Sequence, residues 1–274
     1  MYFVVLQMSR CKQQPRLKRG AEVLLTLCKN LQSKVMVYTG LFSMRLSTVN
    51  IALIATFAAL QALLTSFPFT ITIGVSGQIT LGIVGGSLIG ILLGPIIGGL
   101  AVSIGSLVGV FLNPAGAIFG IFTVIPPFFG AFGAGCIKIK RGYVVGAVIL
   151  ASLLVFYAHP FGREAFMYPW LHIVAMIVAF SPFAYLAGST FSSSKSAKLI
   201  FGVAVAAFVG VLTDNITGSA LAMWYFSPIL TPEIWLSVMF VYPVERMVAL
   251  ILVTIITTPV YHSLRKAGFT DLLE

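Results

Sequence analysis

Long apolar stretches separated by short polar or proline-containing breaks fill the chain from residue 46 to residue 267. The bilayer core has no water to bind exposed backbone groups, so apolar stretches of this kind are most stable as spanning helices. The pattern predicts eight such helices, over residues 50–67, 78–93, 95–112, 115–137, 142–158, 171–188, 199–218 and 236–262. We therefore expect an all-α fold, a polytopic integral membrane helix bundle of about eight spans.

Residues 78–93 and 95–112 form the most unusual pair, because glycine recurs every few positions and no residue is charged. Glycine destabilises a soluble helix by about 1 kcal/mol relative to alanine, whereas in membranes small residues let helices approach closely. Pro95 suits the first position of the second helix. The helices are short, about 24 and 27 Å, so a partly re-entrant pair is an alternative to two full spans.

Proline marks two other predicted helices. We expect a bend at Pro126-Pro127 within 115–137 and a weakened helix at Pro182 within 171–188. Residues 68–77 are rich in β-branched residues and glycine, which predicts an extended loop.

Composition supports the membrane assignment. Of the 274 residues, 59% are hydrophobic and 9% are charged, whereas soluble domains carry about 25% charged residues. The net charge of +10 is concentrated in residues 1–45, which hold eight of the 17 Lys/Arg and one of the seven Asp/Glu. Nine basic and six acidic residues remain, a net charge of +3. These values exclude a soluble module and a nucleic-acid partner, and predict a multi-pass protein of the cell membrane in contact with the lipid bilayer.

Three domains are expected: a basic extension (1–45), a transmembrane substrate-binding domain (46–267) and a cytoplasmic tail (268–274). The extension is interpreted either as a peripheral segment on an anionic membrane surface or as the result of a start assigned upstream of Met44.

The basic residues predict an orientation for the bundle. With eight spans, residues 138–141, residues 195–198 and the pair Arg265-Lys266 share one side with the N-terminal segment, and Arg163 alone lies on the other. Because Lys and Arg concentrate in cytoplasmic loops, both termini are expected in the cytoplasm.

A few ionisable residues, with one neighbouring amide, fall within predicted spans. They are Asp214, Asn215, Glu245 and Arg246. Ionisable groups at membrane depth are rare and often functional, so one hypothesis is a pocket open to the outside that binds a polar solute. Further candidate binding residues are Trp224 and Tyr225 in the aromatic connection, with Gln78 and Asn113 at helix ends. The alternative is that Glu245 and Arg246 pair with neighbours and fix helix positions.

No catalytic constellation or metal-ligand cluster is visible in the sequence, and no nucleotide-binding motif occurs. We therefore expect neither an enzyme nor a bound cofactor, and an ATP-driven role would need separate ATPase subunits.

Three segments resemble the substrate-binding (S) component of energy-coupling factor (ECF) transporters. They are the alanine-rich helix 51–65, the stretch 92–109 with Gly94, Pro95, Gly98, Gly105 and Gly109, and the final helix 242–268 with Glu245-Arg246 and a later proline. The chain departs from the family where Ser106 replaces a frequent acidic residue and in its span count, since that core has six spans.

The resemblance implies a subunit that captures a vitamin or similar micronutrient, docks on a transmembrane coupling protein and releases solute when two partner ATPases hydrolyse ATP. The docking face it implies is Ala55/Ala59, with Ala58/Ala62 as a second pair; packing against the chain's own helices is the alternative for these alanines. Two other functions are alternatives. One is a stand-alone secondary transporter, which is expected to have internal repeats and a midplane ion site. The other is a non-transport membrane scaffold.

Overall fold

The computed structural model describes residues 48–269, except 67–69, 74–76, 115–118 and 194. The expected extension over residues 1–45 and most of the expected tail lie outside the described residues.

Several helices of the described chain have the length and apolar composition of membrane spans. Five qualify singly, or six if one bent pair counts as one span. The five are α3 (Thr48–Ser66), α5 (Pro95–Leu112), the continuous segment Gly120–Lys138, α11 (Ser196–Tyr225) and α13 (Val241–Lys266). The described part of the chain is therefore an all-α membrane protein with five or six candidate spans, fewer than the eight expected.

The difference in number has a simple cause. Helices α4 (Leu81–Leu93) and α7 (Gly142–Ala158) are apolar but shorter than a full span. A spanning helix needs about 20 residues to cross the hydrocarbon core. The sequence pattern located both helices, but their lengths do not qualify them as single spans.

The helix expected to be weakened at Pro182 is instead divided there into two helices. Helix α9 (Trp170–Phe180) ends before Ser181, and α10 (Pro182–Thr190) leaves it at an angle of 70°. The Ser181 hydroxyl accepts a hydrogen bond from the Phe183 amide at 3.2 Å and so caps α10. Proline at the first helical position needs no amide partner, which makes Ser181-Pro182 a natural start for a new helix.

The predicted bend at Pro126-Pro127 is wrong. A short 3-10 helix, η2 (Gly120–Val124), leads into α6 (Ile125–Lys138), and the prolines lie in the first turn of α6. Their missing amides would have no intrahelical partner there in any case. The prolines therefore mark where a helix begins.

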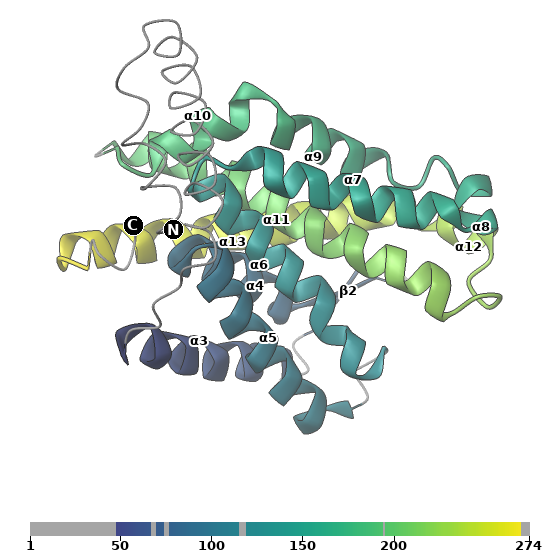
Figure 1. Cartoon of the computed structure of the whole chain (residues 1–274), viewed down its shortest axis with the longest axis horizontal. Coiled ribbons are helices and arrows are strands. Elements are labelled where there is room, and N and C mark those ends of the chain that lie inside the picture. The colour runs from purple at the N-terminus through teal and green to yellow at the C-terminus, as the bar shows by residue number, and fades with distance from the viewer. Residues whose placement is uncertain (1–47, 67–69, 74–76, 115–118, 194, 270–274) are drawn as a thin grey trace, which may run out of the picture. The chain divides into compact units, whose positions relative to one another are not determined.

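Helix α11 lies at the centre of the bundle, where it contacts α4, α6, α7, α9, α10 and α13 (Figure 1). Its most apolar stretch is 67% buried, whereas that of α3 is only 17% buried. Helix α11 therefore forms the core, and α3 lies at its edge.

Helices α4 and α5 form the glycine-rich hairpin, which turns at Gly94. That residue has φ of +81°, a backbone conformation that suits glycine. A Cβ at Gly98 would meet the Gly90 backbone at 2.9 Å, so the two helices approach closely. The interpretation of these glycines as packing residues agrees with this geometry.

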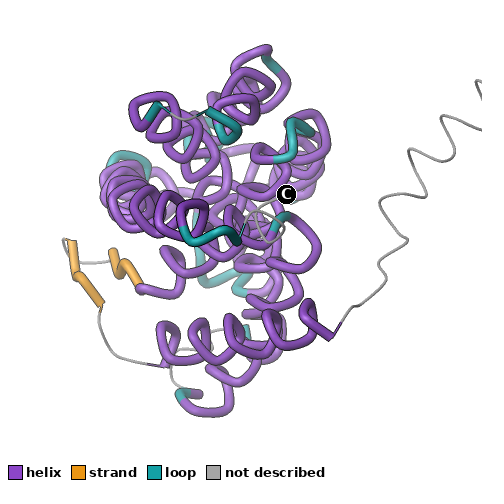
Figure 2. The backbone as a smooth tube through the Cα atoms, turned by 90° about the vertical axis from the view of Figure 1, so that its left-hand side faces the viewer, coloured by secondary structure: helices purple, strands orange, loops and turns teal. Residues whose placement is uncertain are grey.

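The expected extended loop after α3 contains a small antiparallel hairpin, β1 (Thr70–Ile73) paired with β2 (Gly77–Thr80). Figure 2 shows these strands beside the helices, and β2 contacts α4 and α13. Two short helices, α8 (Pro160–Glu164) and α12 (Pro232–Ser237), lie in the connections that precede α9 and α13.

Candidate functional site

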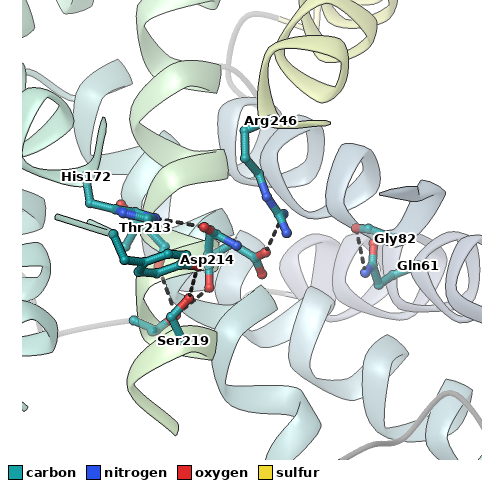
Figure 3. A network of polar contacts seen from close by, with 10 residues as sticks. Gln61, Gly82, His172, Thr213, Asp214, Ser219 and Arg246 are labelled. Carbon is teal, nitrogen blue, oxygen red and sulfur yellow. Dashed lines mark hydrogen bonds and ion pairs between the residues drawn. The ribbon is translucent and has the colours of Figure 1, made fainter. Parts of the chain in front are cut away.

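A cluster of polar side chains lies inside the bundle where α9, α11 and α13 meet. It consists of His172 on α9, Asp214 and Asn215 on α11, and Arg246 on α13, and we call these four residues the polar cluster. Figure 3 shows His172 and Arg246 approaching α11 from different helices. His172 is fully buried, and the Asp214 and Arg246 side chains are 12% and 13% exposed.

Asn215 joins two of the three helices to each other through its amide. The amide nitrogen and oxygen are assigned from their partners: the nitrogen donates to His172 Nε2 at 2.8 Å, and the oxygen accepts from Arg246 Nε at 3.2 Å and Nη2 at 2.9 Å. His172 is then an acceptor at Nε2, so a neutral imidazole carries its proton on Nδ1. The amide thereby links an uncharged ring to a guanidinium group.

Asp214 and Arg246 form an ion pair, with 3.6 Å between Asp214 Oδ2 and Arg246 Nη1. That separation is within ion-pair range but too long for a good hydrogen bond. Helix α6 comes very close to this point, because a Cβ on Gly130 would lie 2.8 Å from Asp214 Cβ. The absence of a side chain at Gly130 therefore makes room for Asp214.

Three aromatic side chains, Tyr168, Trp235 and Tyr242, border the polar cluster on one side, and we call them the aromatic wall. The His172 and Tyr242 rings are stacked, with centroids 5.1 Å apart and planes at 14°. Tyr168 contacts both Tyr242 and Trp235, at centroid distances of 4.9 and 4.8 Å. A polar group flanked by such rings suits a flat or heteroaromatic solute.

Hydrogen bonds hold this aromatic wall in place. The Tyr242 hydroxyl donates to the Tyr168 carbonyl at 2.9 Å and accepts from the Leu171 amide at 3.3 Å. The Tyr168 hydroxyl pairs with Ser219 Oγ at 2.9 Å. Tyr168 lies in the connection between α8 and α9, and burial raises the pKa of its phenol to about 12. It therefore stays protonated at physiological pH and serves as a fixed neutral group.

Three buried donors in or beside the polar cluster lack a hydrogen-bond acceptor among the described residues. They are Arg246 Nη1, Trp235 Nε1 and, in this tautomer, His172 Nδ1. Glu245 is 7% exposed, and no hydrogen bond or ion pair of the described residues involves its carboxylate. Buried polar groups are normally paired, and leaving one unpaired costs about 1–3 kcal/mol. Such groups fit a site that is completed by a bound molecule.

The structure gives no support for a metal at this place. No group of three or more His, Cys, Asp or Glu side chains with metal-binding geometry occurs in the described part of the chain. The chemistry available is recognition of a polar solute by a guanidinium, carboxylates and aromatic rings.

The candidate residues from the sequence separate into two groups. Asp214, Asn215 and Arg246 come together as expected, with Glu245 adjacent on α13. Asp214 lies deeper than expected, since α11 continues to Tyr225, about 16 Å beyond it at 1.5 Å per residue. Arg246 is closer to its helix start than expected, because α13 begins at Val241.

The aromatic candidates Trp224 and Tyr225 have other contacts. The Trp224 indole donates to the Val155 carbonyl at 3.0 Å and its ring contacts His159, while Tyr225 contacts Phe119 edge-on. Both are more than half exposed. They lie in the last turn of α11, which the sequence had suggested was a loop.

The two remaining candidates lie at ends of secondary-structure elements. Asn113 is the C-terminal cap of α5, and its backbone N–H donates to the Gly109 carbonyl at 2.8 Å. The backbone of Gln78 belongs to β2, opposite Thr72.

The alanines of α3 point in two directions. Ala55 and Ala59 are exposed, whereas Ala58 and Ala62 are each 6% exposed. A Cβ on Gly105 of α5 would overlap the Ala58 carbonyl, so this side of α3 packs within the chain. The structure thus leaves Ala55 and Ala59 available to a partner.

Sequence reasoning missed His172, Tyr168, Trp235 and Tyr242. His172 is a single histidine in an apolar helix, which gave no signal of its own. Tyr242 had one available signal, because it lies four residues before Arg246 and therefore on the same face of α13.

No protein-family model matches the chain, and no solved structure matches it. The chain is similar to uncharacterized protein MJ0923 of Methanocaldococcus jannaschii, with 32% identity over 151 residues. The match covers 55% of this chain and 50% of that protein, so the chain spans half the length of this relative.

Proposed function

We propose that the protein is the membrane-embedded substrate-capture subunit of an ATP-driven importer of the ECF type, with a vitamin or similar small micronutrient as its solute. The observation that carries the proposal is a pair of buried donors without a hydrogen-bond acceptor among the described residues, Arg246 Nη1 and Trp235 Nε1, beside an aromatic wall. The Glu245 side chain, 7% exposed, adds a carboxylate next to Arg246. A solute with polar groups on a flat ring system satisfies both parts of this site.

The distribution of charge supports an orientation for such a subunit. Of the nine basic residues in 48–269, seven lie at the ends of α6, α10 and α13 or the starts of α7 and α11. Contacts join these ends, since Arg265 Nη1 donates to the Ser193 carbonyl at 2.7 Å and the Lys140 ammonium lies 5.8 Å from the Tyr185 ring centroid. By the positive-inside rule this basic end faces the cytoplasm. Arg246 then lies five residues from the outer start of α13, and we assign capture of the solute to that side.

Helix α3 supplies the surface for a coupling protein. It is the least buried of the long helices, and Ala55 and Ala59 lie one turn apart on its exposed side. Small residues four positions apart permit close helix contact in a membrane. We assign this face to a transmembrane coupling protein that works with two ATPase subunits.

The proposal is tested by purifying the full-length chain from its native membranes and identifying the proteins and small molecules that accompany it. A coupling protein with paired ATPases and a small solute would support the proposal. A chain isolated with neither would contradict it.

A second candidate function, a stand-alone secondary transporter, is favoured by one observation. Helix α9, which carries His172 in its first turn, ends at the 70° break before α10, and broken helices are common in such transporters. Uptake of solute by vesicles that contain this chain alone, driven by an ion gradient, would favour this second function.

A further inference from the structure

A groove of about 520 Å³ lies between α10 and the start of α11. It belongs to the basic end of the bundle, which Figure 1 shows opposite α8 and α12. Its lining shares no residue with the polar cluster. The wall is polar at Ser189, Ser192, Ser193 and Lys198 and apolar at Leu186 and Phe201.

The polar part of the groove offers a few donors, since the Ser189 and Thr190 hydroxyls already donate to the Leu186 and Ala187 carbonyls at 2.6 and 2.7 Å. Arg265 donates to the carbonyl oxygens of Ser192 and Ser193, at 3.0 and 2.7 Å, so these acceptors are already engaged and the loop is held in place. The Ser193 hydroxyl oxygen accepts from the Lys195 amide at 3.3 Å, which leaves its own proton free to donate. The Lys198 ammonium adds a positive charge to the same wall. Together these groups favour an anion.

No described acidic residue compensates this charge. Glu164 and Glu233 lie on α8 and α12 at the other end of the bundle, and Asp214 and Glu245 lie at or beside the polar cluster. No ion pair within the described part of the chain involves Lys198. An anion in the groove would therefore meet attraction from Lys198 and the neighbouring basic residues without a competing carboxylate.

The apolar part of the groove continues onto the lipid-facing surface. Leu186 and Phe201 are 53% and 38% exposed, and Phe183 and Tyr185 on α10 are exposed beside them. In a membrane protein such side chains contact acyl chains. The groove thus joins an anion-binding end to a hydrocarbon-binding side.

We propose that this groove binds an anionic phospholipid, with its phosphate at Lys198, Ser192 and Ser193 and an acyl chain along Leu186 and Phe201. Basic pockets between helices at the cytoplasmic face of membrane proteins are suited to anionic lipid headgroups. The proposal depends on the membrane fold and the charge of this end, and it is independent of the transport function. A free phosphate ion would share the headgroup chemistry but would make no use of the apolar wall.

The test uses the full-length chain in a neutral detergent, titrated with dioleoyl-phosphatidylglycerol or dioleoyl-phosphatidylcholine and followed by native mass spectrometry. Two variants probe the groove: Lys198→Gln removes its charge, and Ala197→Trp fills it without changing charge, since Ala197 is an exposed lining residue. Arg163→Gln on α8 is the matched control because it removes one positive charge at the opposite end.

We expect wild type and R163Q to prefer phosphatidylglycerol equally. K198Q should bind this lipid about fivefold more weakly, and A197W should lose the preference for it. Equal binding of the two lipids by wild type, or unchanged binding in both groove variants, would overturn the proposal. Inorganic phosphate that binds as tightly as phosphatidylglycerol would also overturn it, in favour of a free-anion site.

Discussion

The carboxylate of Asp214 and the guanidinium of Arg246 lie 3.6 Å apart within an apolar bundle, and they connect its two longest described helices, α11 and α13. The pair is close enough for strong attraction at low dielectric, yet Arg246 Nη1 has no hydrogen-bond acceptor among the described residues. The arrangement holds two charges in position while leaving one guanidinium nitrogen able to donate to a third group. This relationship is the basis of the proposed solute site.

The pairing of Asp214 with Arg246 predicts a specific pattern of stability. Asp214→Asn and Arg246→Gln should each destabilise the protein by about 3 kcal/mol, because each leaves an uncompensated buried charge. The double variant should lose about as much stability as either single variant. Thermal unfolding in detergent measures this, with Arg163→Gln as an exposed-charge control, and strictly additive losses would show that the two charges are not coupled.

The close approach of α6 to α11 predicts that Gly130 cannot carry a side chain. Gly130→Ala should displace Asp214 and destabilise the protein by about 1–3 kcal/mol, together with a loss of solute binding. Gly86→Ala is the matched control, because a Cβ there meets its nearest atoms at 3.7 and 3.8 Å, an ordinary contact. Equal unfolding midpoints for G130A and G86A would count against the packing described at Asp214.

Trp235 and Trp224 should differ in their effect on solute binding. Trp235→Phe removes the buried indole donor that lacks an acceptor, and we expect about fivefold to tenfold weaker solute binding. Trp224→Phe should leave affinity unchanged, since that indole already donates to the Val155 carbonyl. Calorimetric titration with the identified solute measures both, and the reverse order of effects would place the site nearer to Trp224.

Helix positions were predicted well wherever apolar stretches ended at a strong break. Residues 95–112 and 142–158 were predicted with the observed bounds, because Gly94-Pro95 and the basic segment 138–141 limit them. Helix α11 was predicted too short, since Gly218 resembles a helix end in sequence. In the structure α11 continues through Gly218 to Tyr225, and a Cβ added at Gly218 would make only an ordinary contact with Pro126, at 3.5 Å.

The site was predicted only in part, because sequence shows charge but not which helices meet. Asp214, Asn215 and Arg246 were identified because charged groups are energetically unfavourable at membrane depth and are therefore often functional. His172 and Tyr242 join the site through tertiary contact between α9 and α13, which no spacing within one helix reveals. Trp224 and Tyr225 were chosen because they follow Asp214 closely in sequence. Since α11 continues to Tyr225 and rises about 1.5 Å per residue, the helix carries both residues away from Asp214.

The exposed side of α3 predicts a defect in assembly without a defect in binding. Ala55→Leu with Ala59→Leu should prevent co-purification of the coupling protein and leave solute affinity unchanged, because neither side chain contacts the polar cluster. Ala147→Leu on the exposed face of α7 is a matched control that should leave assembly intact. Ala58→Leu should instead destabilise the fold, since Ala58 packs against Gly105. Normal assembly of the Ala55/Ala59 variant would refute the docking face.

The most direct test of the central claim is quantitative mass spectrometry of small molecules retained by the purified full-length protein and its variants. We predict that wild type and Arg163→Gln retain the same solute, and that Arg246→Gln and Glu245→Gln each lose it while remaining folded. A solute retained equally by all four proteins, or absent from wild type, would contradict a binding site at Arg246 and Glu245.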